Sequence, residues 1–127
     1  MAVATRHFSL KEFECKHCHK QDIAQTLIDL CQKIRDYINA PVYINSGYRC
    51  PYYNQVVGGV FNSYHVQGLA ADIRAEMGAR ALFDFIREMY SSGLIPELSF
   101  CYLYQKKNFV HIDVGRKRSG GVFQYHD

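Results

Sequence analysis

Hydrophobic residues recur along two long segments of the chain at the spacing of a helix. Between Asp22 and Asn39 the apolar positions lie three or four residues apart, which predicts an amphipathic helix with Asp22 as its N-cap. The segment Gly78–Ser92 has the same periodicity, and Gly93 directly after it is a typical helix stop. We therefore expect two helices that each pack one apolar face against a core.

Local signals predict two shorter helices. Ser9 and Glu12 have the spacing of a capping box, which opens a short helix near the N-terminus. A second short helix is expected over residues 51–57, ended by the pair Gly58 and Gly59.

Four further segments have the composition and alternation of strands: Val42–Asn45, Leu69–Ala75, Leu98–Tyr104 and Phe109–Val114. The last two would form a hairpin across the polar turn Gln105–Asn108. Together with the helices, these strands predict an α+β fold. We expect a small, mainly antiparallel sheet with helices packed on one face and a groove on the other.

Strand alternation indicates which polar side chains face that groove. Asp72 alternates with apolar neighbours, so its side chain points away from the face that suits the core. His111 and Asp113 lie two residues apart and share the face opposite their apolar neighbours. Gly68, between His65 and Asp72, would let the chain turn tightly enough for His65 to approach the same groove.

Length and composition indicate one ordinary globular domain that spans residues 1–127. The chain has 48% hydrophobic and 21% charged residues, and its formal net charge is +3. This charge is low and spread along the chain, which argues against a nucleic-acid partner. No segment has the pattern of a signal peptide or the length of a membrane span. We expect a monomer that is cytoplasmic as synthesised.

The five cysteines do not have the pattern of a secreted disulfide framework, because their number is odd and their positions are scattered. Cys31 and Cys101 lie within apolar patterns and are expected to be buried free thiols.

Cys15 and Cys18 form a C-x-x-C pair with His17 and His19 beside them. A closed second metal site would need a further ligand, such as Cys50 or His7. The alternatives are a local redox pair or unlinked thiols in a surface turn.

Two imidazoles and one carboxylate, from His65, His111 and Asp72, make a ligand set that leaves a fourth zinc position open. Open sites of this kind are typical of catalytic zinc, whereas structural zinc is usually closed by four Cys or His residues. Each residue alone also has an ordinary interpretation, as a surface or packing histidine or an ion-paired aspartate.

The chain resembles the zinc D-Ala-D-Ala carboxypeptidase family, which shares its fold with the Hedgehog signalling domain. The resemblance runs from about Phe8 to Gly115. Within the family, the chain is similar to the short peptidase-like domains of phages and bacteria. The matching motifs are SGYR, Asn54, VGG, Ser63-Tyr-His65, Gly68, Ala70-Ala-Asp72-Ile and FVHIDVG.

The resemblance implies a Zn²⁺ ion bound by His65, Asp72 and His111. It also implies that Arg49 lies near the substrate, where a guanidinium could bind an oxyanion or a substrate carboxylate. Ser63 matches a family position that orients the loop or contacts substrate, although a loop-capping role fits equally well. The Arg116–Arg118 run is expected to be a solvated basic patch, or to help hold an anionic glycan.

The family's general base is missing from its usual position. That position, three residues before the last ligand, is Asn108, and an amide cannot accept a proton from water. Asp113 is the best replacement from the sequence, since it shares a strand face with His111. It could equally be a group that fixes a ligand or Arg49. Glu97 is a weaker candidate and could be a solvated loop acid.

The function that the resemblance implies is zinc-dependent hydrolysis of peptide bonds in peptidoglycan stem peptides or crosslinks. The enzyme would act at the cell wall if it is phage-encoded. The alternative is a zinc-stabilised module that binds peptidoglycan or a protein without cutting it.

Overall fold

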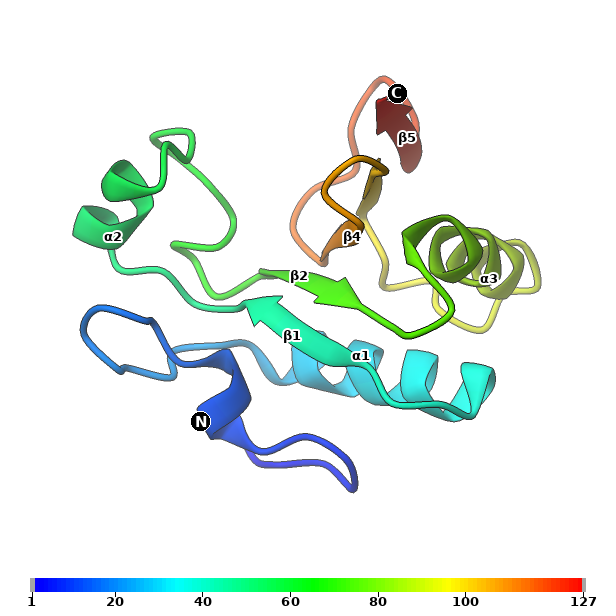
Figure 1. Ribbon diagram of the computed structural model, residues 1–127, viewed down its shortest axis with the longest axis horizontal. Helices are drawn as coiled ribbons and strands as arrows, with labels where there is room; N and C mark the ends of the chain where they lie inside the picture. The colour runs from blue at the N-terminus through cyan, green and yellow to red at the C-terminus, as the bar shows by residue number, and fades with distance from the viewer. Residues whose placement is uncertain (1, 127) are drawn as a thin grey trace.

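The computed structural model describes residues 2–126. Their strands form one five-stranded sheet, and the helices lie beside it (Figure 1). The elements in chain order are η1 (Leu10–Phe13), α1 (Gln25–Ile38), β1 (Tyr43–Ser46), α2 (Pro51–Val56), β2 (Ala70–Arg74), α3 (Ala79–Ser91), β3 (Phe100–Tyr104), β4 (Phe109–Asp113) and β5 (Phe123–His126). The α+β fold expected from the sequence is confirmed.

The sheet has the strand order β1-β2-β4-β3-β5. All neighbouring strands are antiparallel except β3 and β5, which are parallel. The strand β5 was not predicted, because its partner β3 lies about twenty residues back and no tight turn between them marks the pairing. Among residues 2–126 the sheet is therefore mixed, with a single parallel pair at one edge.

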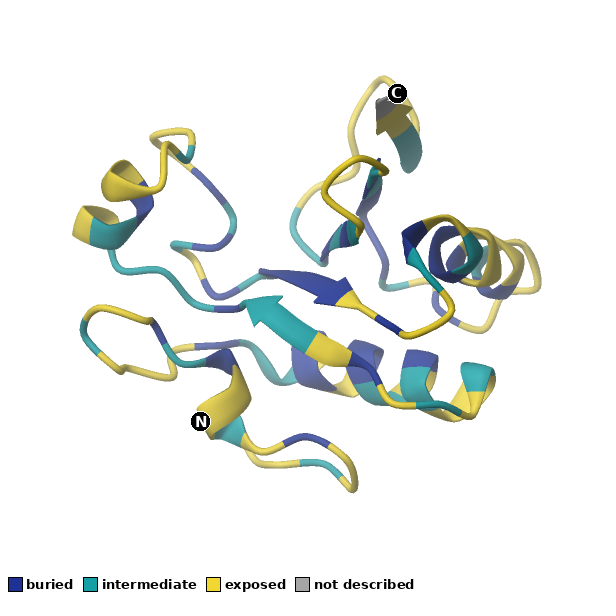
Figure 2. Ribbon diagram, in the orientation of Figure 1, coloured by how far each residue is buried: buried dark blue, intermediate teal, exposed yellow. Residues whose placement is uncertain are grey.

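The hydrophobic core lies between the sheet and the helices α1 and α3. Ala71 and Ile73 of β2 and Val110 and Ile112 of β4 all point into it and are fully buried. Figure 2 shows β2 as a buried strand and each of the two long helices with one buried and one exposed side. This arrangement leaves the opposite face of β2 and β4 for polar side chains.

The helix predicted to begin at Asp22 begins instead at Gln25, with Ala24 at the N-cap position. The physical reason is a contact with a distant turn. The backbone N–H of Ala24 donates to the carbonyl of Gly68 at 2.9 Å, which holds the chain extended before the helix starts. Gly68 has φ +71°, and a Cβ on it would lie 2.1 Å from the Asp22 carbonyl oxygen. Only glycine fits this turn.

The capping box and the hairpin turn agree with the sequence. The Glu12 carboxylate accepts a hydrogen bond from the Ser9 backbone N–H at 2.7 Å, although the helix that follows is a short 3-10 turn. Asn108 ends the hairpin turn in the left-handed conformation, with φ +58°. Asparagine tolerates this conformation better than most residues.

Candidate metal centre and active site

His65, Asp72 and His111 meet on the groove face of the sheet. Asp72 lies at the middle of β2 and His111 at the middle of β4, and the antiparallel register places these two residues directly opposite each other. His65 comes from the turn that precedes β2, and the glycine turn at Gly68 brings it back over the strand. The predicted convergence is thus explained by strand register and one tight turn.

The three side chains face one another through specific atoms. Nε2 of His65 lies 3.2 Å from Oδ1 of Asp72, and Nδ1 of His111 lies 3.0 Å from the same oxygen. The potential ligand atoms of all three residues lie within 4.8 Å of one another. This spacing would let one small cation contact all three after slight side-chain adjustment.

The other nitrogen of each imidazole already has a hydrogen-bond acceptor. Nδ1 of His65 donates to the Gly47 carbonyl at 2.9 Å, since a carbonyl can only accept. Nε2 of His111 faces Oδ2 of Asp113 at 2.8 Å. In neutral imidazoles so arranged, the nitrogens turned toward Asp72 carry lone pairs. Lone pairs that face a carboxylate oxygen require a proton or a metal ion between them. With a metal ion in that place, two ring nitrogens and one carboxylate oxygen are a donor set that fits zinc.

The carboxylate of Asp72 is held ionised by its surroundings. In the metal-free protein, burial opposes its ionisation, but hydrogen bonds with His111 and His65 outweigh burial and lower the pKa of Asp72 well below its usual range. Its second oxygen, Oδ2, accepts a hydrogen bond from Arg49 at 3.3 Å. Arg49 therefore leaves Oδ1 as the oxygen that is turned toward the two histidines.

Arg49 is fixed from three directions. Besides the contact with Asp72, its Nε donates to the Ser46 hydroxyl at 3.1 Å, and Nη1 donates to Oδ1 of Asn54 at 3.3 Å. Asn54 is buried and also donates to the Val60 carbonyl at 2.8 Å. Gly59 is required beside it, because a Cβ there would lie 2.0 Å from Oδ1 of Asn54.

Asn54 was noted only as part of the family pattern, and its support of Arg49 was not predicted. Its position on α2 and the glycine pair that follows were the only signals in the sequence. Ser63 is also buried and accepts the backbone N–H of His65 at 3.2 Å, which is the loop-capping role considered from the sequence. Its side chain also lines the cavity described below.

Asp113 lies on the groove face of β4 but beneath His111, and it is not among the described residues that line the cavity. Its side chain has 0% exposure, and Oδ2 contacts both Nε2 of His111 and an Nη of Arg118, the latter at 3.3 Å. Burial lowers the pKa of His111, but the hydrogen bonds to Asp113 and Asp72 outweigh it and raise this pKa above its usual value. The geometry favours the second sequence-based interpretation of Asp113, a group that fixes a ligand.

Two other candidates for the base have structural partners. Oδ1 of Asn108 accepts the backbone N–H of Ala79 at 2.8 Å, so this side chain caps the first turn of α3. Glu97 forms an ion pair with Lys33 at 2.9 Å. Neither side chain is among the described residues that line the cavity over His65 and His111.

A cavity of about 790 Å³ opens above the three candidate ligands. Five basic residues line it: Arg49, Lys107, Arg116, Lys117 and Arg118. Asp72 is the only carboxylate among the described lining residues. The Arg116–Arg118 run is therefore part of the cavity wall and more than a solvated patch. Arg118 is held by Asp113 and stacks over Phe100, with its guanidinium carbon 3.9 Å from the ring centre.

The cysteines divide into two groups. Cys31 and Cys101 are fully buried free thiols in the core, as predicted. Cys15 and Cys18 lie in the turn after η1, next to Cys50. Burial opposes ionisation of Cys15, but backbone N–H groups of Cys18, Cys50 and His17 lower the pKa of its thiol to about 7.

Two histidines and one aspartate, buried or partly buried, converge on the face of a small mixed sheet below a basic cavity, which is the arrangement of a metallopeptidase-like domain. The family model for Peptidase M15 matches residues 6–113. The chain belongs to this family, the zinc D-Ala-D-Ala carboxypeptidase-like M15 peptidases, and the resemblance seen in the sequence is confirmed. A search of curated proteins finds none that match. Within residues 2–126, the helices are too short or too polar to cross a bilayer.

Proposed function

We propose that this chain is a zinc-dependent peptidase that cleaves peptide bonds in the stem peptides of peptidoglycan. The observation that carries the proposal is the position of the His65, Asp72 and His111 ligand atoms at the floor of a basic cavity. Stem peptides carry free carboxylates, and the five basic residues around the cavity favour an anionic peptide. Family membership supports the peptidase class.

His65, Asp72 and His111 would hold the ion in this proposal. A bound Zn²⁺ would supply a water molecule of lowered pKa and polarise the carbonyl of the scissile bond. Gly47 and Asp113 keep the two imidazoles in the orientation and protonation state that such an ion requires. Asp113 is in this view a positioning residue, because its buried carboxylate has no exposed atom to offer a substrate.

Arg49 is proposed to bind a substrate oxygen. A guanidinium has five N–H groups, and three of those on Arg49 are used by Ser46, Asn54 and Asp72. The remaining two belong to a side chain that is already immobilised at the cavity wall. A donor fixed in advance loses little entropy when it binds a carboxylate or a carbonyl oxygen.

One observation favours a second candidate, a module that binds cell-wall peptide without cutting it. Among the described residues around the cavity, Asp72 is the only carboxylate, and it is already occupied by the two histidines and Arg49. A peptidase of this kind usually places a further group where it can take up the proton of the attacking water. The two candidates differ in a single measurable property, the release of new amino termini.

The test is incubation of the zinc-loaded protein with intact peptidoglycan and with a synthetic stem pentapeptide, followed by mass spectrometry of the products. We expect cleavage that is lost in His65→Ala and kept in His7→Ala. His7 is a matched control because its ring contacts Gln32 instead, at 2.8 Å. Binding of the pentapeptide without any cleavage at saturating zinc would reject the peptidase and support the binding module.

A further inference from the structure

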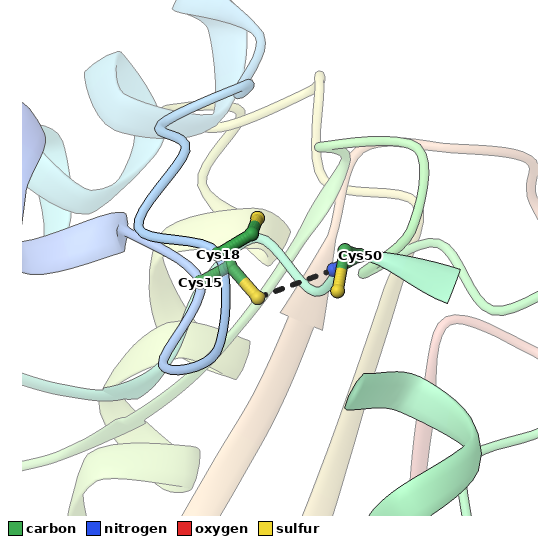
Figure 3. A group of neighbouring side chains, drawn as sticks. All are labelled: Cys15, Cys18 and Cys50. Carbon is green, nitrogen blue, oxygen red and sulfur yellow. Dashed lines mark hydrogen bonds between the residues drawn. The ribbon is translucent and has the colours of Figure 1, made fainter. Parts of the chain in front are cut away.

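Three cysteines from two distant parts of the chain gather outside the cavity. Cys15 and Cys18 belong to the turn after η1, whereas Cys50 directly precedes α2 (Figure 3). Their sulfur atoms lie within 4.8 Å of one another. Cys15 is fully buried, and the other two are half-buried. The fold thus brings together three soft ligands that a single C-x-x-C pair could not provide.

Backbone N–H groups point at two of the three sulfurs, those of Cys15 and Cys50. The N–H of Cys50 donates to Sγ of Cys15 at 3.4 Å, and the N–H of Tyr53 donates to Sγ of Cys50 at 3.4 Å. The turn itself is closed by the His19 N–H, which donates to the Cys15 carbonyl at 2.9 Å. Hydrogen bonds of this kind stabilise the negative sulfur, the form in which cysteine binds metals.

A fourth ligand of the right type lies beside the cluster. Nδ1 of His17, the residue between the two cysteines of the turn, is 3.6 Å from Sγ of Cys50. Its ring packs against Tyr52, with 4.7 Å between the ring centres. Ligand atoms about 2.3 Å from a tetrahedral zinc lie about 3.8 Å apart. The 3.6 Å between His17 and Cys50 is close to this value, and His17 would have to turn toward Cys15 and Cys18 to complete the set.

A disulfide is the alternative product of this cluster, but it would engage fewer of the sulfur atoms than a metal ion would. It would join two of the three sulfurs and leave the third thiol beside it, whereas a metal ion uses all three together. Three cysteines and one histidine are a common closed set for structural zinc. Cys15, Cys18 and Cys50 are free thiols in the structure, and either a disulfide or a metal site could form from that state.

We propose that Cys15, Cys18, Cys50 and His17 bind a second, structural zinc ion. This ion would join the N-terminal turn to the segment that carries Arg49. Backbone hydrogen bonds nearby already connect the same segments. The N–H of Tyr48 donates to the Phe13 carbonyl at 2.9 Å, and the N–H of Arg49 donates to the His65 carbonyl at 3.1 Å. The second ion would therefore hold the Arg49 segment, which is part of the cavity wall, against the N-terminal turn.

The test is the zinc content of protein purified under reducing conditions. We expect two zinc ions per chain in the wild type. One should remain in Cys18→Ser and one in His65→Ala, and none should remain when both changes are combined. Cys31→Ala is the matched control, since it removes a thiol that lies in the core, and it should keep both ions.

Cobalt substitution identifies the ligands. The Co²⁺-loaded wild type and His65→Ala should both show thiolate-to-metal charge-transfer absorption, and Cys18→Ser should lose most of it. His17→Ala should shift the ligand-field bands, and an unchanged spectrum would overturn the assignment of His17.

A separate measurement covers the case in which a cysteine variant does not fold. In the native wild type, zinc should slow the alkylation of Cys18 and Cys50, the two half-buried thiols of the cluster, relative to chelator-treated protein, as followed by peptide mapping. The proposal is overturned if freshly reduced protein binds only the ion that His65→Ala removes. It is also overturned if intact mass shows a disulfide within the cluster while zinc is present in excess.

Discussion

Oδ2 of Asp113 lies 2.8 Å from Nε2 of His111, on the side of the imidazole opposite the nitrogen that faces Asp72. This contact fixes both the direction of the ring and the position of its proton. Acceptors in this position raise the basicity of a metal-binding histidine, and their loss typically lowers metal affinity by about 10- to 100-fold.

The first prediction concerns this contact. Asp113→Asn keeps the size of the side chain but removes its charge, so zinc affinity should fall at least about tenfold, as measured by competition with a chelator. The general-base interpretation predicts a different result: unchanged zinc affinity with a reduced kcat. Arg118→Ala, which removes a cation from the same carboxylate oxygen, should change zinc affinity less.

The second prediction concerns Asn108. Asn108→Gly removes the side-chain cap of α3 but tolerates the positive φ, and should lower the free energy of unfolding by about 1 kcal/mol. Asn108→Ala loses the cap and also strains the backbone, for a total of about 2 kcal/mol.

Asn108→Asp keeps an acceptor oxygen at the start of the helix, so its stability in denaturant titrations should stay close to that of the wild type. Its peptidase activity should also be unchanged, because the side chain points to α3. A large gain in kcat would show that position 108 reaches the reacting groups after all.

The third prediction concerns Arg49. Arg49→Lys keeps the positive charge but cannot reproduce three directed hydrogen bonds and still leave donors for a ligand. We expect kcat/KM for a stem peptide to fall at least about tenfold, equivalent to about 1.4 kcal/mol. Lys107→Arg, a change between the same residue types at the cavity wall, serves as the control and should have little effect.

The fourth prediction concerns the pH dependence of the metal-free protein. The pKa of His111 is raised by Asp113 and Asp72, with His65 and Phe100 as its other neighbours. A raised pKa stabilises the fold below the usual histidine value of about 6.5, and this contribution is lost as the pH rises through the raised value. The lowered pKa of Asp72 acts in the opposite direction, and its contribution is lost as the pH falls below about 3.9.

With a chelator present, the melting temperature should therefore be highest between about pH 4 and pH 6.5 and decline on both sides. His111→Gln should flatten the decline on the alkaline side. An unchanged alkaline decline in that variant would assign the effect to another group.

Alternation along two strands was enough to predict that Asp72, His111 and Asp113 share the groove face. It could not decide what Asp113 does, because a base and a positioning group both require that face. The positioning role that we propose for Asp113 rests instead on the direction of its carboxylate and on its burial, which depend on packing against Arg118. The partner of Asn108 was likewise beyond the sequence, since the helix that it caps begins 29 residues away in the chain.

The Cys50 contact shows the same limit. The C-x-x-C pair signalled a metal or a redox centre, and Cys50 and His7 were the two candidates for a further ligand. The pattern could not choose between them, because Cys50 lies 35 residues further along the chain and His7 contacts Gln32 instead. Contacts between residues so far apart depend on the whole fold, and the periodicity of the sequence does not predict them.

The candidate ligands differ in how firmly the fold holds them. Asp72 and His111 lie on strands with neighbours on both sides, whereas His65 and Arg49 belong to the stretch 47–69, whose regular structure is the short helix α2. An ion that joins the two regions would add its binding free energy to the cost of opening this stretch, about 2.7 kcal/mol at a hundredfold excess over Kd. The supply of zinc would then govern the shape of the substrate cavity as well as the chemistry at its floor.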